Sequence, residues 1–393
     1  MLHQIKNLKK AAKRIKQAVK NNERIVIFAD ADLDGITSAI ILEETIQNLF
    51  NRVQVLSKGV HAVFFSNREE GGYGLSPEAL MDFKGLAPAL LIVLDCGISS
   101  FEGVKQASQA GFEVMIIDHH EVLGQLPAPA LIIDPKQPGD KYAFKKLANV
   151  CLVYKLSEEI FNQEIPQTLK SSFLEIGALG AIADMMPEED CNKRIIQEGS
   201  ACLNGTFRPG MKAIIDIVKS ENDVPRTIFS KIVLALNITG TQGHLTESYI
   251  LFKEKDPAKA AVLARKLFEE SQKRQMRIKE IAQEAISKDN SASPIVFEGN
   301  ELWEQILTGP VASRVCNKTQ KPTFIFKIGK EKCRGSVRMP HGLDGVLALK
   351  KCSVFLEVYG GHPPAAGFTC AKEQVGGLKK CLEEHFQGNN FKF

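Results

Sequence analysis

Three segments of the chain are apolar runs of strand length, and each ends in an aspartate: Arg24–Asp30, Ala89–Asp95 and Glu113–Asp118. Near-continuous apolar strands separated by helical stretches are typical of a parallel sheet that is buried on both faces. Two stretches of helical character lie between the runs, Ile36–Phe50 and Phe101–Ala110. The pattern therefore predicts an α/β fold. Because ligand sites form at the carboxyl ends of parallel strands, it also places three aspartates at one edge of the sheet.

Helical periodicity appears at the start of the chain and again after the predicted sheet. Apolar residues recur at helical spacing from Leu2 to Val19 among lysines and arginines, which predicts a docking helix with a solvated basic face. Further helices are expected over residues 149–218, and one long helix over Asp256–Lys288 has an apolar stripe and an otherwise charged surface. Strands of a second, smaller α/β domain are then expected at Pro294–Phe297, Thr323–Lys327 and Arg334–Arg338.

These patterns divide the chain into three parts. We predict a first domain over residues 1–250, a connecting long helix over 251–290 and a smaller α/β domain over 291–393. A length of 393 residues is sufficient for two domains that each bury a core of their own.

Composition narrows the class of protein without naming a function. Hydrophobic residues make up 44% and charged residues 24% of the chain, as in ordinary globular proteins, and no apolar run is long enough to cross a bilayer, so no membrane partner is expected. The net charge of +4 permits a polyanionic partner but does not indicate one. The nine cysteines show no CxxC pair and no spacing typical of a disulfide framework. They predict buried thiols in a reducing compartment, hence a cytoplasmic location.

The first aspartate-ended run continues into a cluster of acids, Asp30, Asp32 and Asp34, followed by Gly35. Alternate spacing on an extended segment would point the three carboxylates the same way. Such carboxylates repel one another unless a cation lies among them, and Mg²⁺ and Mn²⁺ take oxygen ligands of this kind. An acidic turn or a calcium loop is the alternative. A calcium loop usually has more oxygen ligands downstream, where this chain offers only hydroxyls.

Two further features carry metal-binding chemistry. The third run ends in Asp118, His119 and His120, and imidazole beside carboxylate suits a transition metal such as Mn²⁺ or Zn²⁺. Asp184 lies within an otherwise apolar segment, Leu179–Met186, that is expected to be helical. A carboxylate is costly there unless it is paired or metal-bound, and a salt bridge to a nearby lysine is the alternative.

In this order, the motifs DADLDG (30–35), LDCG (94–97), DHH (118–120) and GAIADM (180–185) resemble those of the DHH phosphoesterase superfamily. GGHPPAAG (360–367) resembles the glycine-rich loop of the superfamily's C-terminal associated domain. Within the superfamily, NREEGGYGL (67–75), RPGM (208–211), VASR (311–314) and GSVR (335–338) resemble segments of the RecJ-type single-strand exonucleases. The resemblance covers nearly the whole chain.

The resemblance implies two divalent cations and a phosphodiester-hydrolysing site, with Mn²⁺ as the favoured ion and Mg²⁺ as the alternative. One cation is expected on Asp30, Asp32 and Asp95, and the other on Asp34, Asp95, His119 and Asp184. Asp95 would then bridge the two ions, and such pairs lie roughly 3.5–4 Å apart. The expected catalytic residues are Asp95, His120, which would face the substrate phosphate, and Asp118, which would orient the histidines.

The same resemblance implies that both domains bind a single-stranded DNA substrate, which would be degraded from its 5′ end to mononucleotides. The expected substrate-binding residues are Arg68 in the first domain and Arg314, Ser336, Arg338, Gly360, Gly361 and His362 in the second. For each single arginine, the alternative to substrate binding is a surface ion pair.

Two departures from the RecJ pattern leave alternatives open. Thr241 stands where the related NAAGR segment has its arginine, so recognition of a 5′-phosphate is in doubt. The chain ends at Phe393 without an OB-fold, which predicts a weaker grip on the strand unless a protein partner supplies that surface. A nanoRNase-type phosphatase acting on short RNA or nucleoside bisphosphates is one alternative. A RecJ-like replication scaffold without activity is the other, and the complete set of expected ligands argues against it.

Overall fold

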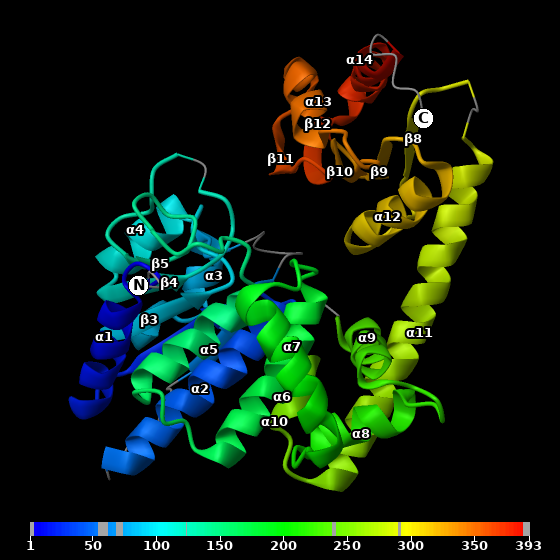
Figure 1. The fold of residues 1–393 in the computed structure, drawn as a ribbon. Coiled ribbons are helices and arrows are strands. Elements are labelled where there is room, and N and C mark those ends of the chain that lie inside the picture. Colours follow the sequence, from blue (N-terminus) through cyan, green and yellow to red (C-terminus); the bar gives the residue numbers. More distant parts are fainter. Residues whose placement is uncertain are drawn as a thin grey trace. The chain divides into compact units, whose positions relative to one another are not determined.

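The computed structural model describes residues 4–53, 62–67, 74–122, 124–237, 241–289 and 292–387. The chain divides into two compact units, Met1–Ser271 and Gln272–Phe393, and the division falls inside the long helix α11 (Pro257–Ser287) (Figure 1). Residues 251–290 are expected to form a separate connector, but the contacts assign the first half of this helix to one unit and the second half to the other. None of the described helices is both long enough and apolar enough to cross a membrane.

The first unit is built on a five-stranded sheet in which every strand is parallel to its neighbours, in the order β2-β1-β3-β4-β5. This confirms the expected α/β class. The two outermost strands, β2 and β5, were not predicted, because four and three residues carry too little pattern. The strands are β1 (Ile25–Ala29), β2 (Ala62–Phe65), β3 (Ala89–Leu94), β4 (Phe112–Ile117) and β5 (Leu131–Ile133).

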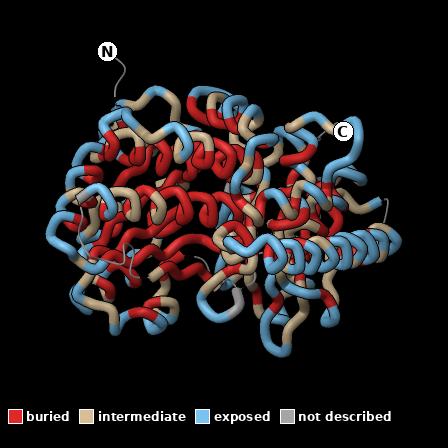
Figure 2. Tube along the Cα trace, turned by 90° about the horizontal axis from the view of Figure 1, so that it is seen from below, coloured by how far each residue is buried: buried red, intermediate tan, exposed pale blue. Residues whose placement is uncertain are grey.

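Helices cover both faces of this sheet, which is why its strands are almost entirely apolar and buried (Figure 2), with Glu113 in β4 as an exposed exception. Ile25 and Ile27 face one core, which they share with α1 (Leu8–Lys20), α2 (Leu33–Val53) and α5 (Asn149–Ile160). Val26 and Phe28 face the other core, with α3 (Pro77–Met81) and α4 (Phe101–Gln109).

Helix α1 begins at Leu8, later than the apolar spacing predicts. Asn7 has a left-handed φ of 68°, and its side-chain amide donates to the carbonyl of Ile132 at 2.8 Å. This hydrogen bond to β5 fixes Asn7 in a non-helical conformation, so α1 begins at the next residue. Leu8, Ile15 and Val19 are buried as the pattern predicts.

A helical layer follows the sheet and packs on α2. It comprises α6 (Gln167–Ala183), α7 (Asp190–Cys202), α8 (Pro209–Val218), α9 (Pro225–Leu236) and α10 (Glu247–Lys253), with the small hairpin of β6 (Thr241–Gln242) and β7 (Leu245–Thr246). Arg208 is buried at the start of α8, where both terminal nitrogens donate to Glu44 of α2 at 2.9 and 2.6 Å. Its Nε donates to Ser172 of α6 at 2.9 Å, so one guanidinium joins three helices.

The second unit contains a mixed sheet in the order β11-β12-β10-β9-β8, antiparallel except between β8 and β9. Its helices are α12 (Thr308–Thr319), α13 (Gly345–Lys351) and α14 (Val375–Gln387). Its strands are β8 (Val296–Asn300), β9 (Thr323–Ile328), β10 (Lys332–Arg338), β11 (Val358–His362) and β12 (Ala365–Ala371).

One expectation about the cysteines is wrong. Cys352, at the end of α13, forms a disulfide with Cys381 of α14, and their Cα atoms are 6.0 Å apart. The two residues are 29 positions apart, so spacing alone could not reveal a pair that only the packing of two helices brings together. The other seven cysteines carry free thiols.

The buried Arg208–Glu44 pair yields a stability prediction. Arg208→Met should lower the free energy of unfolding by on the order of 3 kcal/mol, because it leaves a largely buried carboxylate without its bidentate partner. Arg226→Met is the matched control, since Arg226 pairs with Glu188 at the surface and its loss should cost less than about 1 kcal/mol. Equal losses in urea denaturation would contradict this ranking.

Glu175 yields a pH prediction. It is buried on α6, and burial raises the pKa of its carboxyl to about 7 despite a hydrogen bond from Thr206. The folded state therefore holds this proton more tightly than the unfolded state, and stability is lost as pH rises from about 4.5 through 7. Glu175→Gln should remove this loss and gain on the order of 2 kcal/mol at pH 8 but little at pH 4. Denaturation curves at the two pH values test it, and a gain at pH 4 only would contradict it.

Candidate metal centre

Three aspartates occupy successive strand ends on the sheet. Asp30 follows β1, Asp95 follows β3 and Asp118 follows β4, and each backbone N–H donates to the last carbonyl of the next strand, at 3.1, 3.0 and 3.1 Å. These bonds continue the ladder by one residue and fix the three backbones at one edge. The edge lies where the strand order reverses between β1 and β3, the position at which open α/β sheets bind ligands.

The expectation that Asp30, Asp32 and Asp34 lie on one extended segment is wrong, because the chain turns into a helix among them. Asp32 caps α2, with Oδ1 accepting from the N–H of Gly35 at 3.1 Å, and Asp34 lies in the first turn. A side chain at Gly35 would place Cβ 2.2 Å from the carbonyl oxygen of Asp30. Only glycine therefore permits this turn, and the turn sends Asp34 to different partners from Asp30 and Asp32.

Asp34 is held by the amino terminus of α5. Its two carboxylate oxygens accept from the N–H groups of Asn149 and Val150, at 2.7 and 2.8 Å. Burial raises the pKa of Asp34 to about 7, helped by the charge of Asp32 and opposed by those two N–H groups. Asn149 is not among the residues expected at the site. In the orientation that satisfies its side-chain amide, the nitrogen donates to Ile117 and the oxygen accepts from the N–H of Asp95.

The structure brings the expected ligands together in three groups whose donor atoms lie within 4.8 Å of one another. Around His119, Nε2 lies 3.1 Å from Oδ1 of Asp95, and Nδ1 lies 3.6 Å from Oδ2 of Asp184. The groups are Asp30, Asp32 and Asp95; Asp34, His119 and Asp184; and Asp95, His119 and His120. Asp95 belongs to two groups and has a left-handed φ of 58°.

Asp184 is expected inside a helix, but it lies at the carboxyl end of α6, where it is the C-cap. A carboxylate is unfavourable at the negative end of a helix dipole. Burial raises the pKa of Asp184 to about 9, and the charges of Asp34 and Asp32 add to that effect. No ion pair with a lysine is present for Asp184 among the described residues, so the salt-bridge alternative has no support there.

His120 and Asp118 form a separate pair beside the groups. The ring Nδ1 of His120 lies 2.7 Å from Oδ1 of Asp118, which also accepts from the N–H of His119, while Oδ2 accepts from the N–H of Ile98. Burial alone would raise the pKa of Asp118, but the hydrogen bond and charge of His120 hold it below its usual range. The same bond raises the pKa of His120 against the effect of burial. Asp118 thus orients the ring of His120, and its described contact with His119 is to the backbone.

Three residues at this edge were missed by the sequence analysis. Ser66, after β2, donates to Oδ1 of Asp30 at 2.6 Å. Asp134 follows β5 in the manner of the other strand-end aspartates, and burial raises its pKa to about 7. Lys136, two residues later, forms an ion pair with Glu121 at 3.0 Å, next to His120. The apolar run before Asp134 indicates another strand that ends in an aspartate, but it is only three residues long.

These donors fit divalent cations. Both ring nitrogens of His119 and Oδ2 of Asp184 are buried and make no hydrogen bond within the described residues. Burial, followed by the charges of Asp32 and Asp34, raises the pKa of Asp95 well above its usual value, and a bound cation would relieve this repulsion. Burial also lowers the pKa of His119 to about 3, which leaves a neutral imidazole able to donate a lone pair. Carboxylate oxygens with one neutral imidazole suit Mn²⁺ or Mg²⁺.

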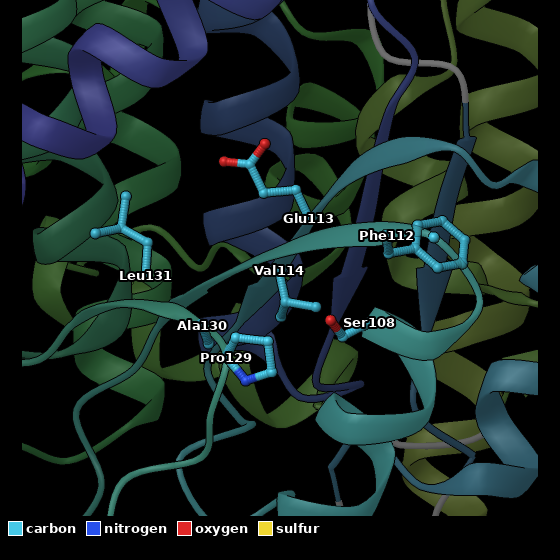
Figure 3. Close-up of a pocket in the computed structure, with 8 residues that line it drawn as sticks. Ser108, Phe112, Glu113, Val114, Pro129, Ala130 and Leu131 are labelled. Carbon is cyan, nitrogen blue, oxygen red and sulfur yellow. The ribbon is translucent and has the colours of Figure 1, made fainter.

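The pocket drawn in Figure 3 lies at the other edge of the sheet and offers no comparable chemistry. It is lined by residues at the start of β4 and just before β5, including Phe112, Val114 and Pro129. Its carboxylate, Glu113, is bound by the guanidinium of Arg14 at 2.7 Å. The chemistry of the first unit therefore gathers at the carboxyl edge.

In the second unit, strand pairing places the expected substrate-binding residues in two neighbouring rows. Ser336, Gly367 and Gly360 are paired across β10, β12 and β11, and Arg338, Ala365 and His362 form the row two residues along. Gly361 has a φ of 134°, and a Cβ there would lie 2.5 Å from the carbonyl oxygen of Ala365. Glycine is thus required at 361 but not at 360, where a Cβ would meet nothing within 4 Å.

Ser336 and Arg338 converge on the amino terminus of α12. The hydroxyl of Ser336 lies 2.9 Å from that of Thr308, and Nε of Arg338 donates to Ser313 at 2.9 Å. The Nη2 of Arg338 and the Ser336 hydroxyl both lie close to Gly309. The surface ion pair weighed for each arginine is not found for Arg338 among the described residues. Arg314 is exposed on the same helix.

Three expected features cannot be placed in this way. Arg68 lies outside the described residues, with most of the NREEGGYGL segment. Residues 238–240 also lie outside them, and the side chains of Thr241 and His362 are not described.

Comparison with known protein families gives the class of this fold and site. Residues 24–181 match the DHH family N-terminal domain, which includes every aspartate and histidine of the centre except Asp184, and residues 293–388 match the DHHA1 domain. The first unit therefore contains a segment that matches the DHH family, and the second unit contains one that matches the DHHA1 domain.

RecJ exonucleases are among the proteins that this chain resembles. The single-stranded-DNA-specific exonuclease RecJ of Bacillus subtilis is 32% identical over 97% of this chain, and that of Thermus thermophilus is 28% identical over 97%. The matched regions cover 48% and 54% of those relatives, so the chain spans about half their length.

Solved RecJ structures share the fold. A crystal structure of exonuclease RecJ bound to manganese has a TM-score of 0.80 at 23% identity and covers 98% of this chain and 96% of its own. Thermus thermophilus RecJ in complex with Mn²⁺ has a TM-score of 0.83 at 22% identity and covers 99% of this chain and 56% of its own.

The geometry predicts a stability response to metal that depends on Asp95. Adding Mn²⁺ at about 100 times its dissociation constant should stabilise the protein by about 2.7 kcal/mol, because only the folded state gathers the ligands. Asp95→Asn should melt at the same or a higher temperature than the natural protein in EDTA, since it removes one repelling carboxylate, and should lose most of the Mn²⁺ response. Differential scanning fluorimetry with and without Mn²⁺ measures both. A full Mn²⁺ response in Asp95→Asn would contradict the expectation that Asp95 is a metal ligand.

Proposed function

We propose that this chain is a metal-dependent phosphodiesterase that degrades single-stranded DNA from an end. The observation that carries the proposal is the convergence of Asp30, Asp32, Asp34, Asp95, His119 and Asp184 in adjoining groups at the carboxyl edge of the sheet. The similarity to RecJ exonucleases over nearly the whole chain supports single-stranded DNA as the substrate.

The ligand groups are suited to a pair of divalent cations. Asp30, Asp32 and Asp95 would hold one, and Asp34, Asp95, His119 and Asp184 the other, with Mn²⁺ favoured and Mg²⁺ the alternative. Such a pair neutralises charge on the phosphate and acidifies a water molecule for in-line attack. Manganese and magnesium are the ions named with the solved RecJ structures.

The remaining residues position the phosphate and handle protons. The Nδ1 of His120 is committed to Asp118, so Nε2 is the nitrogen directed away from that carboxylate. With its pKa raised, His120 is suited to donate a hydrogen bond or a proton to a phosphate oxygen. The backbone N–H groups that hold Asp34 and Asp118 keep the ligand framework in place without occupying the groups expected to meet the substrate.

The second unit would bind the strand. Arg338 and Ser336 at the amino terminus of α12 present a cation, a hydroxyl and a helix dipole to an anion, which suits a phosphate of the nucleic-acid backbone. Gly360, Gly361 and His362 on the edge strand β11, Arg314 on α12 and Arg68 in the first unit complete the proposed set. Degradation in the 5′→3′ direction to mononucleotides, and a protein partner that extends the DNA-binding surface, are part of the same proposal.

The experiment uses the purified chain with Mn²⁺ and end-labelled single-stranded DNA of about 5 and about 40 nucleotides, with and without a 5′-phosphate, beside matched RNAs. We expect stepwise shortening of the long DNA, lost by at least about 100-fold in Asp95→Ala because the bridging carboxylate is removed. Asp216→Ala, which removes an exposed carboxylate on α8, is the control and should cleave normally.

The pattern of products decides among the alternatives. Cleavage restricted to the shortest oligomers, above all RNA, would replace the exonuclease by a nanoRNase-type phosphatase. Binding of DNA without metal-dependent cleavage would leave a scaffold. Indifference to the 5′-phosphate would show that the threonine at position 241 has changed end recognition.

A further inference from the structure

The residue directly after Asp184 has two costly properties at once. Met185 has a left-handed φ of 57°, and its side chain is 88% exposed, the most of any large hydrophobic residue in the described part of the chain. The other seven non-glycine residues with positive φ in that part are all polar, namely asparagine, aspartate or glutamine, and asparagine and aspartate are the side chains that adopt this conformation most readily. Methionine at 185 therefore stands out in backbone and in side chain.

The backbone strain has a simple remedy that this sequence does not use. Asp184 is the C-cap of α6, and Met185 occupies the next position, where its N–H donates to the carbonyl of Ile182 at 3.3 Å. Glycine is the usual residue at this position, because it adopts the left-handed conformation without strain. Neither burial nor helix capping therefore accounts for a methionine here.

The position of Met185 indicates what its side chain contacts. The candidate centre is closed on the side of Asp95 and His119, whose side chains are each 3% exposed, and open on the side of Asp184 and His120, at 20% and 33%. Met185 is one peptide bond beyond the partly exposed Asp184 and is itself exposed, so it adjoins the accessible part of the centre. A substrate whose phosphate reaches the centre must approach from there, with the sugar and base of the same nucleotide beside it.

We propose that Met185 is a substrate-contact residue whose side chain packs against the sugar and base of the nucleotide adjoining the scissile phosphate. This inference rests on the proposed function. A thioether chain is flexible and polarisable and packs well on aromatic faces, so it would contact any of the four bases. Apolar contact with a base is tolerant of sequence, as an exonuclease acting on many sequences requires. The contact would also explain why a methionine occupies a position at which glycine is usual.

The test compares Met185→Gly and Met185→Leu with the natural protein on two substrates. One is single-stranded DNA, and the other is the same strand with an abasic terminal nucleotide. Met185→Gly should keep its Mn²⁺-induced thermal shift and melt at the same or a higher temperature, because the strain is relieved. Its KM for the intact strand should rise about fivefold to tenfold. Met185→Leu, which keeps an apolar side chain, should stay within about twofold of the natural protein.

The abasic substrate separates a contact with the base from an indirect effect on Asp184. If Met185 contacts the base, the natural protein should have a higher KM for the abasic strand than for the intact strand. On the abasic strand, Met185→Gly should then raise the KM little further. Equal KM increases on both substrates would overturn the base contact, and so would an unchanged KM in Met185→Gly. Met81→Ala, which removes another exposed methionine at the end of α3, is the control and should change neither substrate's KM.

The proposed function and this inference fail in different ways. If the natural protein does not cleave single-stranded DNA with Mn²⁺, the proposed function fails, and the contact falls with it. If it cleaves normally and Met185→Gly cleaves equally well, only the contact is excluded.

Discussion

The first unit depends on one electrostatic constraint, the gathering of mutually repelling carboxylates at a single edge of a buried sheet. Burial and the neighbouring acids raise the pKa values of Asp34, Asp95 and Asp184 together. The surroundings supply fixed dipoles: N–H groups of α5 for Asp34 and the Ser66 hydroxyl for Asp30. Such dipoles orient carboxylates without neutralising them, so the cluster keeps its affinity for cations.

The cost of this arrangement is concentrated where chain geometry is least favourable. Asp95 and Met185 both have a left-handed backbone conformation, and Asp184 lies at the negative end of the α6 dipole. Each conformation costs of order 1–3 kcal/mol, and such features persist only where the surrounding structure determines them. Here the surroundings are two extensive cores, one on each face of the sheet, against which the strands and α6 pack.

The parts of the fold and site that the sequence predicts are those with a local signature. The runs before Asp30, Asp95 and Asp118 are long and apolar, so their strands and the common edge could be predicted, together with the residues that converge there. The different partners of Asp32 and Asp34 could not be predicted, because they depend on α2 beginning at Leu33 and not at Ile36. The contact of Asn149 with Asp34 and the Cys352–Cys381 bond join residues distant in sequence, and no local pattern encodes them.

The two units have electrostatic properties of opposite sign. The first concentrates carboxylates and a neutral imidazole, which favour cations. The second brings Arg338 to the positive end of α12, where a guanidinium beside a helix amino terminus is unfavourable unless an anion lies between them. Burial also lowers the pKa of Arg338, because it removes water from the charged guanidinium. A polyphosphate strand accompanied by divalent cations satisfies both requirements at once. The carboxylate cluster of the first unit and the helix amino terminus of the second are thus complementary to the two components of the metal-dependent nucleic-acid substrate proposed above.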